Sequence, residues 1–156
     1  MQTCFINSPL GITKIVGDEN GISIITVLSE GEISKTIPIQ LKEAVSQLQD
    51  YFAGNRTNFT FKLNPKGNDF QQRVWQELLN IPFSKTLSYL ELSKKLGDVK
   101  AIRAVASAIG KNPLWIVIPC HRVIGKDGSL TGYAGGLWRK KWLLEHENPT
   151  NQQSLF

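Results

Sequence analysis

The sequence predicts an α+β protein: a small N-terminal antiparallel sheet with one helix, then a mostly helical C-terminal domain of the winged helix-turn-helix type. Three observations support this fold class: short apolar runs divided by turn residues near the start, helical periodicity after residue 68, and two short capped helices in close succession. With 41% hydrophobic and 20% charged residues, the 156-residue chain is neither collagen-like nor disordered. We expect domains at residues 1–65 and 66–150, and a polar tail at 151–156.

The N-terminal domain is expected to contain four strands and a helix. Turn residues such as those at 9–11 separate four β-rich runs, at residues 4–7, 12–16, 22–28 and 33–39. Apolar residues then recur at helical spacing and stop at Gly54; they are Leu41, Val45, Leu48 and Phe52. A helix with such a stripe can cover one face of the sheet.

The C-terminal domain opens with capped helices. Asn68 is placed to cap a helix that ends near residue 81. Ser88 and Glu91 form a capping box for a second helix, which Gly97 ends, and Asp98 caps a third helix. The second and third helices, joined by a very short turn, predict a helix-turn-helix.

The rest of this domain predicts a wing and a closing helix. An apolar, strand-like run at residues 114–118 and a shorter one at 123–124 are followed by a turn at Asp127-Gly128. A Gly-rich stretch at 132–136 then leads into a helix over 137–147. A helix-turn-helix followed by a hairpin-like segment is a common way to place a helix in a DNA groove.

The positive charge of the chain is concentrated in its second part. Residues 66–156 carry thirteen basic and seven acidic side chains, a net charge of +6, whereas residues 1–65 have a net charge of −1. On the third C-terminal helix, four side chains fall within about 80° of arc, namely Lys100, Arg103, Ser107 and Lys111. This basic stripe favours a nucleic-acid partner, although charge alone is equally compatible with a surface that only keeps the protein in solution.

Cys120 is the candidate nucleophile. It follows an apolar run and a proline, and His121 is next to it, while a second histidine lies beside Glu147 on the last helix. A free thiol with a pKa of about 8.5 needs a base at neutral pH, and an imidazole held by a carboxylate can be that base. The alternative for any single cysteine is a small buried hydrophobe. Adjacent side chains on an extended backbone diverge, so a relay would need an irregular turn or a water.

Other classes of site and location are disfavoured. Two cysteines and two histidines are too few for a disulfide framework, or for a zinc site made only of these residue types, so we expect no metal. No apolar run approaches the length of a membrane span, and the N-terminus lacks a basic segment before an apolar core. We therefore expect a cytosolic chain without a membrane anchor.

A family resemblance is carried by residues 112–124, which read Asn-Pro-Leu-Trp-Ile-Val-Ile-Pro-Cys-His-Arg-Val-Ile. This stretch resembles the active-site signature of the O6-alkylguanine-DNA alkyltransferases, also called methylated-DNA–protein-cysteine methyltransferases. The similarity extends upstream over residues 70–108 and downstream over 132–147, about half of the chain in all. Residues 1–65 match only in length and pattern.

The resemblance implies a single-use repair reaction. Cys120 would attack the alkyl carbon on O6 of guanine, or the one on O4 of thymine, with His121 acting through water as base and Glu147 orienting it. Asn112 would tie the turn that shapes the site, and the Tyr89 hydroxyl would donate to the departing guanine; a core aromatic is the alternative for Tyr89. No cofactor is implied, and the alkylated cysteine has no easy hydrolytic exit.

The resemblance also implies how DNA is held. The partner would be double-stranded DNA, bound by a monomer through the minor groove with the damaged nucleotide flipped out. Arg103 would fill the vacated stack, or else contact a phosphate. Further DNA contacts would come from Lys100, Ala104, Ser107, Tyr89 and Arg122. The base pocket would be lined by Tyr133, Ala134, Gly135, Val123 and Trp115, with a core role equally open for the last two.

Two other functions fit some of these features. A winged-helix protein could sense alkylated DNA without transferring the group, in which case Cys120 would keep its free thiol. A Cys-His-Asn hydrolase could be built from Cys120, His121 and Asn112, and it would turn over many times. The basic second part of the chain favours the transferase and the sensor over the hydrolase.

Overall fold

The computed structural model describes residues 1–125, 128 and 132–149, in two compact units. One unit comprises Met1–Lys66 with Pro113–Val117, and the other comprises Gly67–Asn112 with Ile118–Phe156. The expected turn residue Asp127 and the expected tail at 151–156 lie outside the described residues. Among the helices described, none is long and apolar enough to cross a bilayer.

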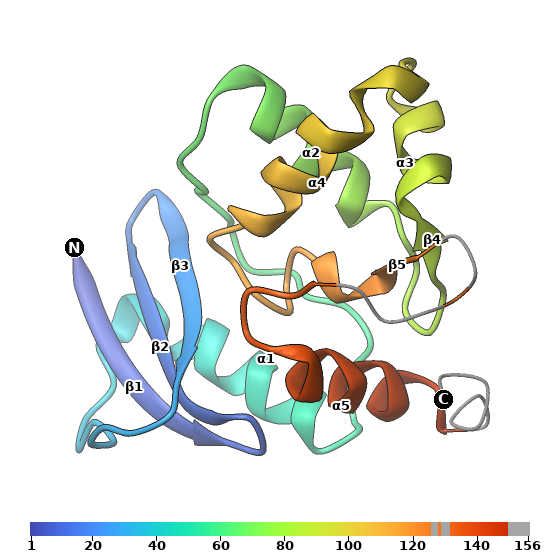
Figure 1. The fold of residues 1–156 in the computed structure, drawn as a ribbon. Coiled ribbons are helices and arrows are strands. Elements are labelled where there is room, and N and C mark those ends of the chain that lie inside the picture. Colours follow the sequence, from blue (N-terminus) through green and yellow to red (C-terminus); the bar gives the residue numbers. More distant parts are fainter. Residues whose placement is uncertain (126–127, 129–131, 150–156) are drawn as a thin grey trace. The chain divides into compact units, whose positions relative to one another are not determined.

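The N-terminal unit is built on a three-stranded antiparallel sheet in the order β1-β2-β3 (Figure 1). The strands are β1(Gln2–Ser8), β2(Gly11–Asp18) and β3(Gly21–Leu28). Cys4, Ile15 and Ile25 lie side by side in register and are fully buried, so alternate residues of each strand form the core. The strands predicted at 4–7, 12–16 and 22–28 are confirmed, and Cys4 is a core residue.

The strand predicted at residues 33–39 is wrong. Its apolar ends Ile33 and Ile39 are exposed, and Pro38 has no N–H to give to a ladder. Ser34 makes the only described backbone bond of this run to a strand, donating its N–H to the Phe5 carbonyl at 2.9 Å. The chain then turns through η1(Ile39–Leu41) into α1(Lys42–Phe52), the helix that the apolar stripe predicts.

The C-terminal unit opens with the predicted capped helices. They are α2(Asp69–Leu79), α3(Tyr89–Lys95) and, after η2(Val99–Ala101), α4(Ile102–Gly110). Asn68 and Ser88 each form a capping box with the residue three positions on, and Asp98 accepts from the backbone of Lys100. The buried Trp75 indole donates to the Ala108 carbonyl at 2.9 Å and ties α2 to α4.

The wing differs from the expected hairpin. β5(Val123–Ile124) pairs in parallel with β4(Leu87–Ser88), the two residues that precede α3. A parallel pair needs a long connection, so this two-stranded ladder joins the start of α3 to the segment after Cys120. The last helix, α5(Leu137–Glu147), has the predicted bounds, and Gly136 caps it with φ of 90°, a value that favours glycine.

The apolar run at residues 114–118 is a turn and not a strand. Its one bridge to the sheet joins Leu114 to Ile25, and Trp115 donates its N–H to the Ile25 carbonyl at 3.0 Å. Ile116 has φ of 76°, which is unusual for a β-branched residue. Through these bonds residues 113–117 group with the N-terminal unit, whereas the sequence analysis divided the chain near residue 65. Local periodicity carries no information about such a distant backbone pairing.

Candidate active site

Cys120 begins a single 3-10 turn, η3(Cys120–Arg122), directly after the rigid residue Pro119. Its own N–H donates to the Ile118 carbonyl at 2.7 Å, and the N–H of Arg122 donates to the Pro119 carbonyl at 3.0 Å. The backbone at Cys120 is therefore an irregular turn and not an extended strand. The cysteine is 5% exposed.

A pocket of about 570 Å³ opens beside Cys120 within the C-terminal unit. Its walls come from α3, α4, η3 and the Gly-rich stretch, and they are mostly apolar. The lining residues are Tyr89, Ile102, Arg103, Ala106, Ile109, Gly110, Cys120, Gly132, Tyr133 and Ala134. A mostly apolar pocket of this size suits a small-molecule-sized ligand. Arg103 lines the pocket and is also exposed to solvent.

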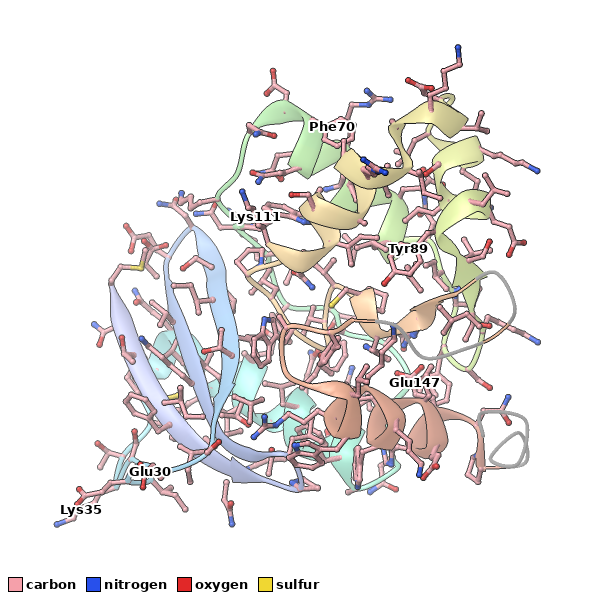
Figure 2. The ribbon with its side chains drawn as sticks, viewed as in Figure 1. Glu30, Lys35, Phe70, Tyr89, Lys111 and Glu147 are labelled. Carbon is pink, nitrogen blue, oxygen red and sulfur yellow. The ribbon has the colours of Figure 1, made fainter. Side chains whose placement is uncertain are left out.

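A buried network connects the Cys120 turn to α5. The His121 imidazole has its Nε2 atom 2.7 Å from Oε2 of Glu147. Arg122 donates to both oxygens of the same carboxylate, from Nε to Oε1 at 2.8 Å and from Nη2 to Oε2 at 3.0 Å. Its Nη1 donates to the Ile81 carbonyl at 2.7 Å. Figure 2 marks Glu147 on α5.

The charges in this network favour a neutral His121 beside an ionised Glu147. Burial alone would raise the pKa of the Glu147 carboxyl, but the His121 and Arg122 contacts outweigh it and hold that pKa well below its usual range. Burial lowers the pKa of His121 more than the Glu147 carboxylate raises it. A neutral His121 then donates from Nε2 to Glu147, which leaves the lone pair on Nδ1. Nδ1 is buried and has no hydrogen-bond partner among the described residues.

The Cys120 thiol is harder to ionise than a free cysteine, because burial raises its pKa. Three neighbours oppose burial: the side chain of Asn112, the ammonium of Lys140 and the hydroxyl of Tyr133. Asn112 is itself buried, and its Nδ2 donates to the Ile118 carbonyl at 2.8 Å, so it braces the turn that carries the cysteine. Lys140 was not predicted from the sequence.

Comparisons with known proteins assign both parts of the chain to one family. The family model described as "6-O-methylguanine DNA methyltransferase, DNA binding domain" matches residues 69–149, and the model described as "6-O-methylguanine DNA methyltransferase, ribonuclease-like domain" matches residues 1–65. Among curated relatives, the methylated-DNA–protein-cysteine methyltransferase of Mycobacterium tuberculosis is 46% identical over 91% of this chain and 89% of its own. The relative of the same name from Methanosarcina acetivorans is 41% identical, over 94% of this chain and 98% of its own.

The chain belongs to the O6-methylguanine DNA methyltransferase family. Solved structures support the same assignment. A crystal structure of the Mycobacterium tuberculosis O6-methylguanine methyltransferase has a TM-score of 0.85 and 42% identity, covering 95% of this chain and 93% of that one. A crystal structure of Mycobacterium tuberculosis OGT in complex with DNA has a TM-score of 0.87 and 44% identity, covering 96% and 94%.

Most of the site residues that the resemblance implies lie in the pocket wall or in the buried network behind Cys120. Cys120, Tyr89, Arg103, Tyr133 and Ala134 line the pocket. Asn112, His121 and Glu147 form the buried support behind it. Lys100, Ala104 and Ser107 are exposed on η2 and α4.

Arg122 requires a correction. The resemblance implies a DNA contact, but the side chain is buried and its guanidinium is engaged with Glu147 and with the Ile81 carbonyl. The guanidinium N–H groups of Arg122 therefore bond inside the protein and not to DNA. We assign Arg122 to holding the Glu147 carboxylate in place. The spacing of the methyltransferase signature gave no sign of this ion pair.

Three expected pocket residues have other surroundings in this methyltransferase. Val123 is fully buried in β5 and pairs with Leu87, which is a core role. Trp115 belongs to the N-terminal unit through its bond to β3. Gly135 is buried, and its carbonyl accepts from Nη1 of Arg139 at 2.9 Å. Five residues that line the pocket were not predicted from the sequence: Ile102, Ala106, Ile109, Gly110 and Gly132.

Within residues 1–125, 128 and 132–149, no three His, Cys, Asp or Glu side chains gather as a metal site would require. The side-chain groups that interact with the Cys120 thiol are the Asn112 amide, the Lys140 ammonium and the Tyr133 hydroxyl, which suit hydrogen bonding to a sulfur and stabilisation of its negative charge.

Proposed function

We propose that this chain repairs DNA by direct reversal, moving the alkyl group of O6-alkylguanine to Cys120 in an irreversible reaction that uses each protein molecule once. One observation carries the proposal: Cys120 lines the pocket while the next residue, His121, is held by the buried Glu147. The related curated proteins are named for the same transfer.

The reaction begins with the thiol proton. We propose that a water molecule bridges Sγ of Cys120 and Nδ1 of His121, so that the proton leaves the sulfur for the imidazole. The His121 imidazolium that forms is stabilised by the Glu147 carboxylate at 2.7 Å. Ionisation of the thiol is therefore coupled to a base whose orientation is fixed.

The thiolate then displaces guanine. An S–C bond forms as the C–O6 bond breaks, and the electron pair of that bond passes to the guanine. The guanine takes up one proton from solvent, and His121 returns to solvent the proton that it took from the thiol, so the step balances. The Tyr89 hydroxyl, at the pocket wall, is suited to donate a hydrogen bond to the departing base. The product is a thioether, whose carbon is a poor target for water, and this makes the transfer a single turnover.

The substrate must leave the duplex to reach this pocket. O6 of a stacked guanine is inaccessible, and flipping it out costs a few kcal/mol, less for a base that pairs badly. We propose that α4 enters the minor groove, where exposed Ala104 permits close approach and Arg103 fills the vacated stack. Lys100 and Ser107 would contact the backbone. The structure of OGT from Mycobacterium tuberculosis in complex with DNA supports a DNA partner.

We assign these roles to a C-terminal domain of residues 66–150 acting as a monomer, with residues 1–65 as a structural domain. O4-methylthymine is a second candidate substrate, since it presents an alkyl group on a comparable exocyclic oxygen. The second candidate function is a sensor that binds alkylated DNA without transfer. Burial of the Cys120 thiol, which raises its pKa, favours this alternative.

Mass spectrometry of intact protein and peptides tests the transfer. After incubation with a duplex that contains O6-methylguanine, we expect a gain of about 14 Da, one methylene group, on the peptide that holds Cys120. Cys120→Ser should bind the duplex without the gain. Cys4→Ser, at the cysteine in the core of the sheet, should keep the gain when folded. Duplex binding by the wild type without any mass gain would establish the sensor instead.

A further inference from the structure

Lys140 is the most unusual charged residue of the C-terminal unit, because its side chain is fully buried. Lysine is rarely buried completely, since removing an ammonium group from water is costly unless other groups compensate it. Lys140 also lies in the first turn of α5, which begins at Leu137, and a cation is disfavoured at a helix N-terminus. Both its burial and its position in the helix should make Lys140 unfavourable for the stability of the fold.

The Lys140 ammonium points to the wall of the pocket. Its Nζ donates to the Gly132 carbonyl at 3.4 Å and lies 6.0 Å from the centre of the Tyr89 ring. Gly132 and Tyr89 both line the pocket, together with Cys120. The positive charge therefore lies among pocket residues, and it lowers the pKa of the Cys120 thiol.

We propose that Lys140 is the buried counter-charge of the Cys120 thiolate, which makes the nucleophile available inside an apolar pocket. This inference rests on the proposed function, because it assigns to that reaction a residue outside the Cys120, His121 and Glu147 set. Lys140 keeps its proton throughout, and the thiol proton still goes to His121.

The physical need for a counter-charge follows from the burial of Cys120. Burial raises the pKa of the thiol, and an ammonium nearby favours the thiolate and lowers that pKa. The interaction is mutual: burial lowers the pKa of Lys140 to about 8, and the thiolate opposes this. At neutral pH the ammonium is therefore present when the thiolate forms.

The titratable groups that face Lys140 are few among the described residues. Cys120 and His121 come from η3, and Tyr89 comes from α3. Tyr133, which follows Gly132, interacts with the Cys120 thiol. The Lys140 charge also lowers the pKa of His121, which helps to keep that imidazole neutral and able to accept a proton. One cation thus favours both the thiolate and the unprotonated base.

A purely structural role is the alternative, in which Lys140 only holds the Gly132 carbonyl and the stretch that follows it. The two roles differ in their pH dependence. Loss of a structural bond lowers reactivity at every pH, whereas loss of the counter-charge moves the midpoint of thiol ionisation upward.

The rate of Cys120 alkylation by iodoacetamide between pH 6 and 10, followed on the Cys120 peptide, separates these roles. Lys140→Met keeps the length of the side chain and removes its charge. We expect the midpoint of thiol ionisation to rise by about one pH unit or more, so the alkylation rate at pH 7 should fall by at least about tenfold. The two rates should converge as the pH rises above about 8, because Lys140 of the wild type then loses its own charge. Lys140→Arg should restore part of the rate, and Lys85→Met, at an exposed lysine of the same unit, should match the wild type.

An unmoved midpoint in a folded Lys140→Met protein, judged by its thermal unfolding and duplex binding, would overturn the proposal. The outcome is independent of the repair reaction, because iodoacetamide needs no DNA. If the wild type takes no methyl group from DNA but the midpoint moves, the proposed function fails and the counter-charge stands. If the wild type takes the methyl group and the midpoint does not move, only the counter-charge fails.

Discussion

The Nε2 atom of His121 lies 2.7 Å from Oε2 of Glu147, and this contact determines which nitrogen of the imidazole remains basic. Arg122 holds the same carboxylate with two hydrogen bonds. The carboxylate is therefore ionised and accepts from His121, so Nδ1 carries the lone pair. A buried nitrogen with a lone pair, adjacent in sequence to Cys120, is a suitable proton acceptor for the thiol.

Glu147→Gln should be strongly destabilising. The substitution leaves the Arg122 guanidinium buried without its counter-charge, and breaking a buried pair costs about 3–5 kcal/mol. Urea unfolding measures the loss. As a matched control, Asp50→Asn removes the ion pair with Arg56, whose atoms are 3.9 Å apart and partly exposed, and should cost about 0–1 kcal/mol. Equal losses at the two sites would contradict the role assigned to the buried network.

Stability should fall as the solution becomes acidic, in two stages. His121 has a lowered pKa when folded, so below its unfolded pKa of about 6.5 the unfolded chain binds the extra proton and is favoured. Glu147 has a depressed pKa when folded, so its contribution is present above its unfolded pKa of about 4.3 and is lost as the pH falls further. Urea midpoints between pH 7.5 and 3.5 should show both.

A folded His121→Gln protein should lose the first stage and keep the second. Glutamine cannot take up a proton in this range, whereas Glu147 still titrates through Arg122. A wild-type stability that is constant from pH 7 to 5 would show that His121 is not held neutral in the folded protein.

The local signals of the sequence were reliable for the helices. Asn68 and Ser88 each complete their capping boxes within three residues, so a short stretch contains all of the information, and both boxes are present. The run at 33–39 has the residue types of a strand, but it forms none and leaves Ile33 and Ile39 exposed. Strand formation depends on a partner that residue types alone do not reveal.

The active site was predictable where it is contiguous, and less so where it depends on distant packing. Cys120 and His121 are neighbours in the chain, but Glu147 was assigned only through the family resemblance. Lys140 was missed because lysine is normally a surface residue. A signal was available: Lys140, Leu143, Leu144 and Glu147 follow helical spacing, and all four are buried on one face of α5.

Arg103→Ala should separate flipping from chemistry. Arg103 is exposed and lines the pocket, so its loss should slow methyl transfer from a duplex far more than reaction with free O6-benzylguanine. Single-turnover rates with both substrates measure the difference. Lys42→Ala, at an exposed lysine of α1, should leave both rates unchanged. Equal losses on both substrates for Arg103→Ala would mean that this residue does not support flipping.

Tyr89→Phe tests whether the phenol assists the leaving group. Phenylalanine keeps the ring that lines the pocket and lies 6.0 Å from the Lys140 ammonium, and it removes only the hydroxyl. One hydrogen bond made in the transition state is worth about 1 kcal/mol, so the rate constant should fall about fivefold while duplex affinity is retained. Single-turnover transfer from O6-methylguanine DNA gives the rate constant, and a fluorescence titration gives the affinity. An unchanged rate constant would assign Tyr89 to packing of the pocket wall, because the ring alone would then account for its presence.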